Sequence, residues 1–156
     1  TITKYIKGIF LSSPMASLSD SKDLEYMEFR KGVLKVWKEL KNIFKCKVYY
    51  AGEERPTEKM FREPSICFKH NFDKLNEQDA FVLVYPEKLP TGALVEVGWA
   101  LAKEKYCLFF VHCSTKLPYI LEKASDYPKT RIVQYKSFDD ILTYINGHEK
   151  NNIFKI

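Results

Sequence analysis

Residues 79–86 read DAFVLVYP, and residues 92–103 read GALVEVGWALAK after a loop of five residues. The apolar run that follows Asp79 is typical of a β-strand buried on both faces of a parallel sheet. The second segment is predicted to be a helix whose strongly polar residues are Glu96 and Lys103 alone. Because residues 106–112 form another apolar run, the stretch predicts a strand–loop–helix–strand unit that aims Glu96 from the loop-to-helix junction into a pocket.

Glu96 is unusual because its neighbours in the predicted helix, among them Val95, Val97 and Trp99, are apolar. Gly92 is expected to allow a tight turn that opens this helix, which places Glu96 in its first or second turn. One interpretation is a partly desolvated carboxylate that points into a cleft and acts as nucleophile or general base. The other is a carboxylate that interacts with helix N-terminal amides or lies on an exposed helical face.

Strand-like and helix-like segments alternate along the rest of the chain. The expected strands are 5–12, 47–51, 80–85, 106–112 and 131–135. The expected helices are 19–44, 67–75, 92–103, 117–124 and 138–145, the first of them capped by Ser19 or Asp20. This order predicts a single α/β domain over residues 1–156, with a doubly wound, five-stranded parallel sheet and helices on both faces, as in flavodoxin-like folds. Ligands of such sheets bind beyond the carboxyl ends of the strands.

Composition narrows the class of protein. The chain has 156 residues, a formal net charge of +5 and no apolar run near the roughly 20 residues of a membrane helix. Basic residues are dispersed, which indicates either solvated helix faces or attraction for an anionic ligand such as a nucleotide, and disfavours binding of duplex nucleic acid. The four cysteines form no C-x-x-C pair, so buried free thiols and a cytoplasmic setting are expected.

Sequence motifs for cofactors and metals are lacking. The chain contains neither a G-x-x-x-x-G-K-[ST] phosphate loop nor a G-x-G-x-x-G fingerprint. His70, His112 and His148 are scattered, and no Cys/His spacing fits zinc. We therefore expect neither a cofactor nor a metal.

The pattern G-x-x-x-E-x-G-x-A at residues 92–100, preceded by a strand that begins with Asp79, resembles the nucleoside 2-deoxyribosyltransferase superfamily, which includes nucleotide N-glycosidases. The segment GIFLSSP at residues 8–14 is similar to the first strand and loop of that family. The resemblance implies that Glu96 attacks the anomeric carbon and forms a glycosyl-enzyme ester, which a second base or water resolves. It also implies a homodimer or higher homo-oligomer, with Trp99 and the apolar face around it at the interface.

The resemblance assigns further residues to the substrate site. Ser12 follows the first strand, and Thr91 and Gly92 lie where sugar hydroxyls or a phosphate are held. Asn71 takes the place of a base-contacting Asp. Thr130 is the nearest match to a polar residue that a neighbouring subunit supplies.

Several matches differ in residue type. Phe10 stands where the transferases have a Tyr that orients the nucleophile, and Pro90 where they have a sugar-contacting Asp or Ser. We therefore expect an enzyme, either a deoxyribosyltransferase or an N-glycosidase, that acts on a (deoxy)nucleoside or nucleotide. A catalytically silent nucleotide-binding or signalling module and an NAD glycohydrolase are the alternatives.

Overall fold

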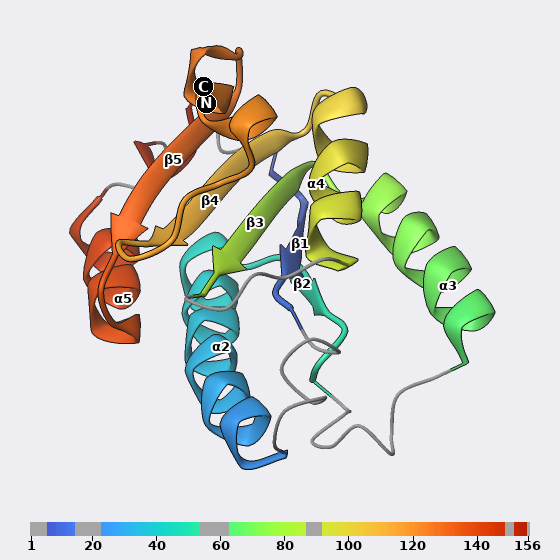
Figure 1. Ribbon diagram of the computed structural model, residues 1–156, viewed down its shortest axis with the longest axis horizontal. Helices are drawn as coiled ribbons and strands as arrows, with labels where there is room; N and C mark the ends of the chain where they lie inside the picture. The colour runs from blue at the N-terminus through green and yellow to red at the C-terminus, as the bar shows by residue number, and fades with distance from the viewer. Residues whose placement is uncertain (1–5, 15–22, 54–62, 87–91, 149–151, 156) are drawn as a thin grey trace.

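The computed structural model describes residues 6–14, 23–53, 63–86, 92–148 and 152–155, and its strands form one sheet. In chain order these strands are β1 (Gly8–Ser12), β2 (Lys47–Tyr50), β3 (Ala80–Tyr85), β4 (Tyr106–His112) and β5 (Thr130–Tyr135). Their order across the sheet is β2-β1-β3-β4-β5, and all neighbours are parallel (Figure 1). The chain reverses its direction of winding between β1 and β3, which is the point where sheets of this kind bind ligands.

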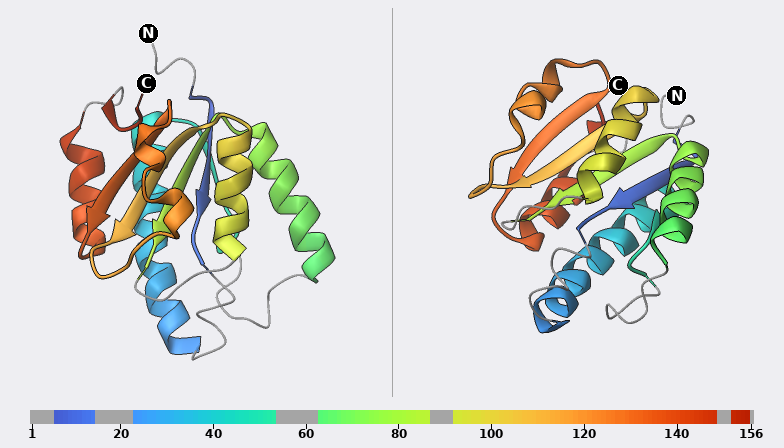
Figure 2. Two further views of the ribbon diagram at one scale, coloured as in Figure 1. Left: turned by 45° about the horizontal axis from the view of Figure 1, so that its top comes forward. Right: turned by 45° about the vertical axis from the view of Figure 1, so that its right-hand side comes forward.

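Helices cover both faces of this sheet, as the views in Figure 2 show. On one face lie α2 (Asp23–Phe44) and α5 (Phe138–Gly147), and on the other lie α3 (Pro64–Glu77) and α4 (Gly92–Ala102). Two short 3₁₀ turns, η3 (Tyr119–Leu121) and η4 (Ala124–Asp126), precede β5. The predicted α/β fold, with a doubly wound five-stranded parallel sheet, is confirmed.

Two hydrophobic clusters fill the space between the sheet and its helices. In β1, Ile9 and Leu11 belong to the cluster under α2 and α5, whereas Phe10 belongs to the cluster under α3 and α4. Successive strand residues point to opposite faces, so a strand covered on both sides is apolar throughout. Close packing of α2 on α5 depends on Gly32, where an added Cβ would lie 2.2 Å from the Phe138 ring.

Two segments differ from their predicted structure. The helix α3 begins at Pro64, three residues before the predicted start at 67, because proline suits the first turn of a helix, where its missing N–H is not needed. The prediction of a helix at 117–124 is wrong, since the segment between β4 and β5 forms only the turns η3 and η4. The expected caps of α2, Ser19 and Asp20, lie outside the described residues. No described helix has the length and apolarity to cross a membrane.

Candidate functional site

Ser12 is the last residue of β1 and lies at the carboxyl edge of the sheet. It pairs with Leu83 of β3, and its side chain points to the same face as Phe10, two residues earlier, towards α3 and α4. Only 2% of its surface is exposed. Its hydroxyl donates a hydrogen bond of 2.6 Å to Oε1 of Glu96. The structure therefore brings together two predicted site residues that are 84 positions apart in the chain.

Glu96 occupies the second turn of α4. This helix buries Ala93, Val97 and Ala100 against the sheet. Glu96 follows Ala93 by three residues and precedes Ala100 by four, so it lies near the same side of the helix. Its side chain is partly buried and meets Ser12. The alternative interpretation, a carboxylate on an exposed helical face, does not match this placement.

The protonation of Glu96 is shifted by its surroundings. Burial raises the pKa of its carboxyl group from 4.5 to about 7, and hydrogen bonds from Ser12 and Asn71 oppose this rise. Desolvation disfavours the charged form, whereas donors to the carboxylate favour it. The carboxyl group is therefore close to half ionised at neutral pH.

Asn71 of α3 is the third member of the group. Its side chain hydrogen-bonds to Glu96, and its amide oxygen Oδ1 accepts a 2.9 Å hydrogen bond from the hydroxyl of Tyr49. Since a carboxylate has no proton to give, the amide nitrogen donates to ionised Glu96. The ring of His70 meets the ring of Tyr49 edge-on at 5.6 Å. Hydrogen bonds thus connect four side chains into one polar cluster, which consists of Ser12 of β1, Tyr49 of β2, Asn71 of α3 and Glu96 of α4.

Tyr49 was missed as a candidate site residue, because two adjacent tyrosines in a short strand suggest core or interface packing. Strand register supplies the missing information: Tyr49 pairs with Phe10 across β2 and β1. Phe10 itself is 1% exposed, and its ring packs on Tyr49 at 5.2 Å and on Phe81 at 5.9 Å. Phe10 therefore forms the apolar floor beside Ser12 and offers no hydroxyl group.

Tyr85 ends β3 on the same face of the sheet as Leu83. It is fully buried, and its hydroxyl has no hydrogen-bond partner in the described part of the chain. Burial raises the pKa of this hydroxyl. Tyr85 therefore adds a further polar atom to the carboxyl edge, next to the strand that bears Ser12.

The remaining predicted site residues are placed differently. Gly92 is the first residue of α4, as expected, but no described glycine has a positive φ, so this turn does not use a conformation reserved for glycine. Thr91 lies outside the described residues. Thr130 begins β5 at the amino edge of the sheet and is 1% exposed. Within one chain it is therefore at the opposite edge from Glu96.

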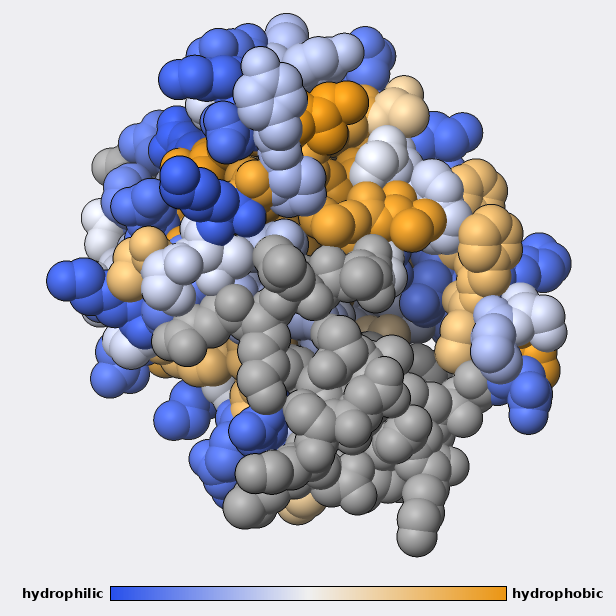
Figure 3. Space-filling view, viewed as in Figure 1, coloured by the Kyte–Doolittle hydropathy of each residue, from blue (hydrophilic) through white to orange (hydrophobic). Residues whose placement is uncertain are grey.

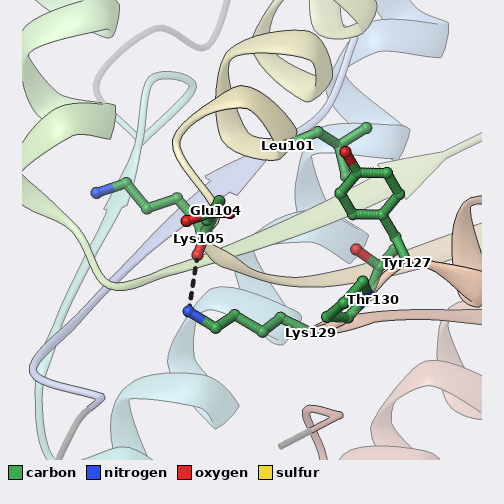
Figure 4. Close-up of a pocket in the computed structure, with 7 residues that line it drawn as sticks. Leu101, Glu104, Lys105, Tyr127, Lys129 and Thr130 are labelled. Atoms are coloured by element: carbon green, nitrogen blue, oxygen red, sulfur yellow. Dashed lines mark hydrogen bonds between the residues drawn. The ribbon is translucent and has the colours of Figure 1, made fainter.

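A cavity of about 290 Å³ lies at this amino edge (Figure 4). Its lining includes Leu101, Glu104, Lys105, Tyr127, Lys129 and Thr130. The charged ends of its lysines contact the backbone, since Lys129 Nζ donates to the carbonyl oxygen of Glu104 at 3.3 Å and Lys105 Nζ to that of Asn76 at 3.1 Å. The first bond joins the turn between α4 and β4 to the segment before β5, and the second joins that turn to the C-terminal end of α3.

Metal ligands and disulfides are not features of the described structure. Among the residues it describes, no three His, Cys, Asp or Glu side chains are grouped as metal ligands. All four cysteines are free thiols. Only Cys107 is buried, whereas Cys46 and Cys67 are half-buried and Cys113 is exposed, so the expectation of buried thiols was too general.

The outer surface of α3 and α4 carries exposed apolar side chains, with Ile66 53%, Phe68 61% and Val95 50% exposed. In Figure 3 apolar residues run along α3 at the right of the molecule. Trp99 meets the rings of Phe68 and Phe72 edge-on at 5.2 and 4.8 Å. Gly98, also on this surface, has no atom within 4 Å of an added Cβ, so it does not serve close packing within the chain.

The fold and the site together define an α/β protein with a carboxyl group at the point where the strand order reverses. No protein-family model and no curated protein sequence matches the chain. Solved structures do match. The CMP N-glycosidase BcmB of Clostridium botulinum shares 19% identity at a TM-score of 0.63, over 90% of this chain and 98% of its own.

Two further structures have the same fold. The solution structure of BlsM has 18% identity and a TM-score of 0.72, over 92% of this chain and 89% of its own. A conserved protein of Enterococcus faecalis V583 has 13% identity and a TM-score of 0.52, over 91% of this chain and 98% of its own. The resemblance seen in the sequence is thus confirmed at the level of the fold, which this chain shares with a nucleotide N-glycosidase over most of its length.

Proposed function

We propose that the protein cleaves or transfers the N-glycosidic bond of a nucleoside or nucleotide, with Glu96 as the nucleophile. One observation carries the proposal: a partly buried carboxyl group, held by Ser12 and Asn71, lies at the carboxyl edge of the sheet between β1 and β3. The similarity in fold to a CMP N-glycosidase supports the same reaction class.

The reaction has two steps. A carboxylate oxygen of Glu96 forms a bond to the anomeric carbon as the bond from that carbon to the base nitrogen breaks, and the leaving base keeps the electron pair and takes up a proton. Water then hydrolyses the glycosyl ester, which releases the sugar and restores Glu96. In a transferase another base would attack the ester. Ser12 and Asn71 hold the carboxylate, while Thr91 and Gly92 are proposed to contact the sugar or its phosphate.

The pKa of Glu96 suits this role. A carboxyl group with a pKa of about 7 is ionised in a substantial fraction of molecules at neutral pH. Its negative charge is poorly solvated, which makes the oxygen a better nucleophile than that of a fully hydrated carboxylate. The ordinary pKa of a surface Glu would instead accompany a strongly hydrated and less reactive group.

The test is release of free base from CMP, dCMP, other nucleotides, nucleosides and NAD, measured by chromatography. Mass spectrometry of the intact protein after rapid quenching would detect the glycosyl ester. Glu96→Gln is expected to lower base release at least about 10³-fold, because no other described group replaces the nucleophile. Glu104→Gln, at the amino edge, is the matched control and is expected to leave the rate unchanged.

The outcomes separate the candidate functions. Base release that survives Glu96→Gln removes Glu96 from the mechanism. Saturable binding without turnover, even after long incubation, supports a silent nucleotide-binding module, for which the residue types at Phe10, Asn71 and Pro90 are the motivation. Nicotinamide release from NAD, with no release from the other substrates, supports an NAD glycohydrolase.

Self-association is proposed through the apolar surface of α3 and α4. Ile66, Phe68 and Val95 are each at least half exposed there, and exposed apolar side chains that cluster are typical of interfaces. Sedimentation of the protein and of Phe68→Glu would test this, with a dimer expected for the first and a monomer for the second. The free thiols support a reducing compartment, and we propose the cytoplasm.

A further inference from the structure

We infer that Tyr49 is a positioning residue of the Glu96 site, whose hydroxyl holds the side-chain amide of Asn71 with its nitrogen towards Glu96. The catalytic consequence of this arrangement rests on the proposed function. Its structural consequence, an altered protonation of Glu96, does not. The two parts can therefore be tested separately.

The position of Tyr49 is fixed by contacts that do not involve Glu96. Its backbone pairs with that of Phe10, and the two rings lie 5.2 Å apart. On the other side its ring meets His70 edge-on at 5.6 Å. From this position the hydroxyl reaches Oδ1 of Asn71 at 2.9 Å. A strand and a helix thus hold the donor before any ligand is bound.

The chemistry of an amide explains why such a donor is needed. The oxygen and nitrogen of an Asn side chain have similar size, and a half-turn exchanges them. The exchanged orientation would place the amide oxygen against the carboxylate of Glu96, and two acceptors repel each other. Donation from Tyr49 satisfies the oxygen in the productive orientation, which leaves the nitrogen for Glu96. Loss of the hydroxyl leaves a partly buried oxygen unpaired in that orientation.

The register between β1 and β2 adds an independent point. Phe10 and Tyr49 are cross-strand neighbours, so the aromatic residue at position 10 of β1 lacks a hydroxyl, while its paired residue on β2 carries one. From β2 the hydroxyl acts on Glu96 through Asn71, whereas from β1 the nearest hydroxyl, that of Ser12, acts directly. Glu96 therefore accepts hydrogen bonds from two donors: the hydroxyl of Ser12, and the amide of Asn71, which Tyr49 in turn orients.

Other ionisable groups near the cluster have to be separated from this effect. Among the described residues, those on the packed elements include Tyr49 on β2, His70 and Cys67 on α3, and Tyr85 on β3. The shift of the Glu96 pKa has burial as its main cause, and Ser12 and Asn71 as opposing causes, with no charged side chain among them. Histidine side chains in general can change charge near neutral pH, so His70→Gln provides a background without an imidazole at this position.

The experiment measures the pKa of Glu96 directly, by ¹³C NMR titration of protein labelled at the Glu side-chain carboxyl carbon. Tyr49→Phe is expected to raise this pKa by about 0.3 to 1 unit, in the wild-type and His70→Gln backgrounds alike. Tyr144→Phe is the matched control, because its hydroxyl donates to the carbonyl oxygen of Ile153 at 3.1 Å on the other face of the sheet. This control is expected to leave the pKa of Glu96 unchanged.

A double-mutant cycle identifies the route. In an Asn71→Ala background, Tyr49→Phe is expected to cause no further shift, because its effect passes through Asn71. With CMP as substrate, the acid limb of kcat/KM is expected to move to higher pH by the same amount in Tyr49→Phe. The inference is overturned if Tyr49→Phe leaves the pKa of Glu96 unchanged. It is also overturned if Tyr49→Phe raises this pKa by the full amount in the Asn71→Ala background. If no substrate is cleaved, the proposed function fails while the NMR titration still decides the role of Tyr49.

Discussion

The two edges of the sheet differ in how their polar groups are used. At the amino edge a cavity of about 290 Å³ is lined by charged side chains, but the lysine ends bond to backbone carbonyls at Glu104 and Asn76. At the carboxyl edge Ser12 and Asn71 bond to a partly buried carboxyl group whose pKa is about 7. The amino edge thus has a cavity, whereas the carboxyl edge has a carboxyl group with a raised pKa.

This difference indicates which edge carries chemistry. A hydrogen bond from a lysine to a backbone carbonyl stabilises a turn and occupies one of the three N–H donors of the ammonium group. A carboxyl group with a raised pKa costs folding free energy in its charged form, and such groups are concentrated at functional sites. The four predictions below test this contrast, in order of decreasing effect.

The largest effect is expected on stability. The folded-state pKa of Glu96, about 7, lies above its unfolded value of 4.5, so its contribution to stability is full below pH 4.5 and is lost as pH rises through 7. Glu96→Gln does not titrate, and its free energy of unfolding should therefore gain about 2 to 3 kcal/mol on wild type between pH 4.5 and pH 8. Urea unfolding at both pH values measures this gain. Glu104→Gln should show none, and an equal gain there would mean that the contrast between the edges is wrong.

The second effect concerns the rate. Because the nucleophile must be ionised, kcat/KM for base release should fall tenfold for each pH unit below about 7, which amounts to about 100-fold at pH 5. A pH–rate profile with CMP measures this fall. An acid limb near pH 4.5 would mean that Glu96 reacts as a fully hydrated carboxyl group.

The third effect isolates one hydrogen bond. Ser12→Ala removes the 2.6 Å donor to Glu96 and is expected to lower kcat/KM about tenfold at pH 7 and to move the acid limb to higher pH, since this bond lowers the pKa. Ser65→Ala, at an exposed position in the first turn of α3, serves as the control. A loss of rate without movement of the acid limb would assign Ser12 to substrate contact instead.

The smallest effect is expected at the amino edge. Thr130→Val keeps the shape of a side chain that is 1% exposed and removes only its hydroxyl. Within one chain this position is remote from Glu96, so kcat/KM should change less than about twofold. A tenfold loss, seen with a protein that sediments as an oligomer, would instead support a contact supplied by a neighbouring subunit.

The fold and the unusual placement of Glu96 were accessible to prediction because each depends on local sequence. The apolar runs at 80–85 and 106–112 reveal strands covered on both faces, and β3 and β4 coincide with them. Glu96 stands out because its helix is otherwise apolar. Ser12 and Asn71 came from positional resemblance, and the structure brings both to Glu96.

Other features depend on information that single segments do not contain. Tyr49 joins the site through its register with Phe10, and register is set by the whole sheet. The segment 117–124 has a helical spacing of apolar residues, but Pro118 lies within it, immediately before η3, and only 3₁₀ turns form. Thr130 was the nearest match to a polar residue that a neighbouring subunit supplies. The structure places it at the start of β5, and the start of a parallel strand lies at the opposite edge of the sheet from its end.

The Ser12–Glu96 hydrogen bond also bears on how the protein folds. It joins residues 84 positions apart, and it requires β3 to pair with β1 after α2, β2 and α3 have been passed. Pairings between parallel strands of such sequence separation close long loops and therefore form slowly. Until they form, Glu96 is a hydrated carboxyl group of ordinary acidity, so a newly made chain acquires a buried carboxyl group of raised pKa only when the centre of its sheet is complete.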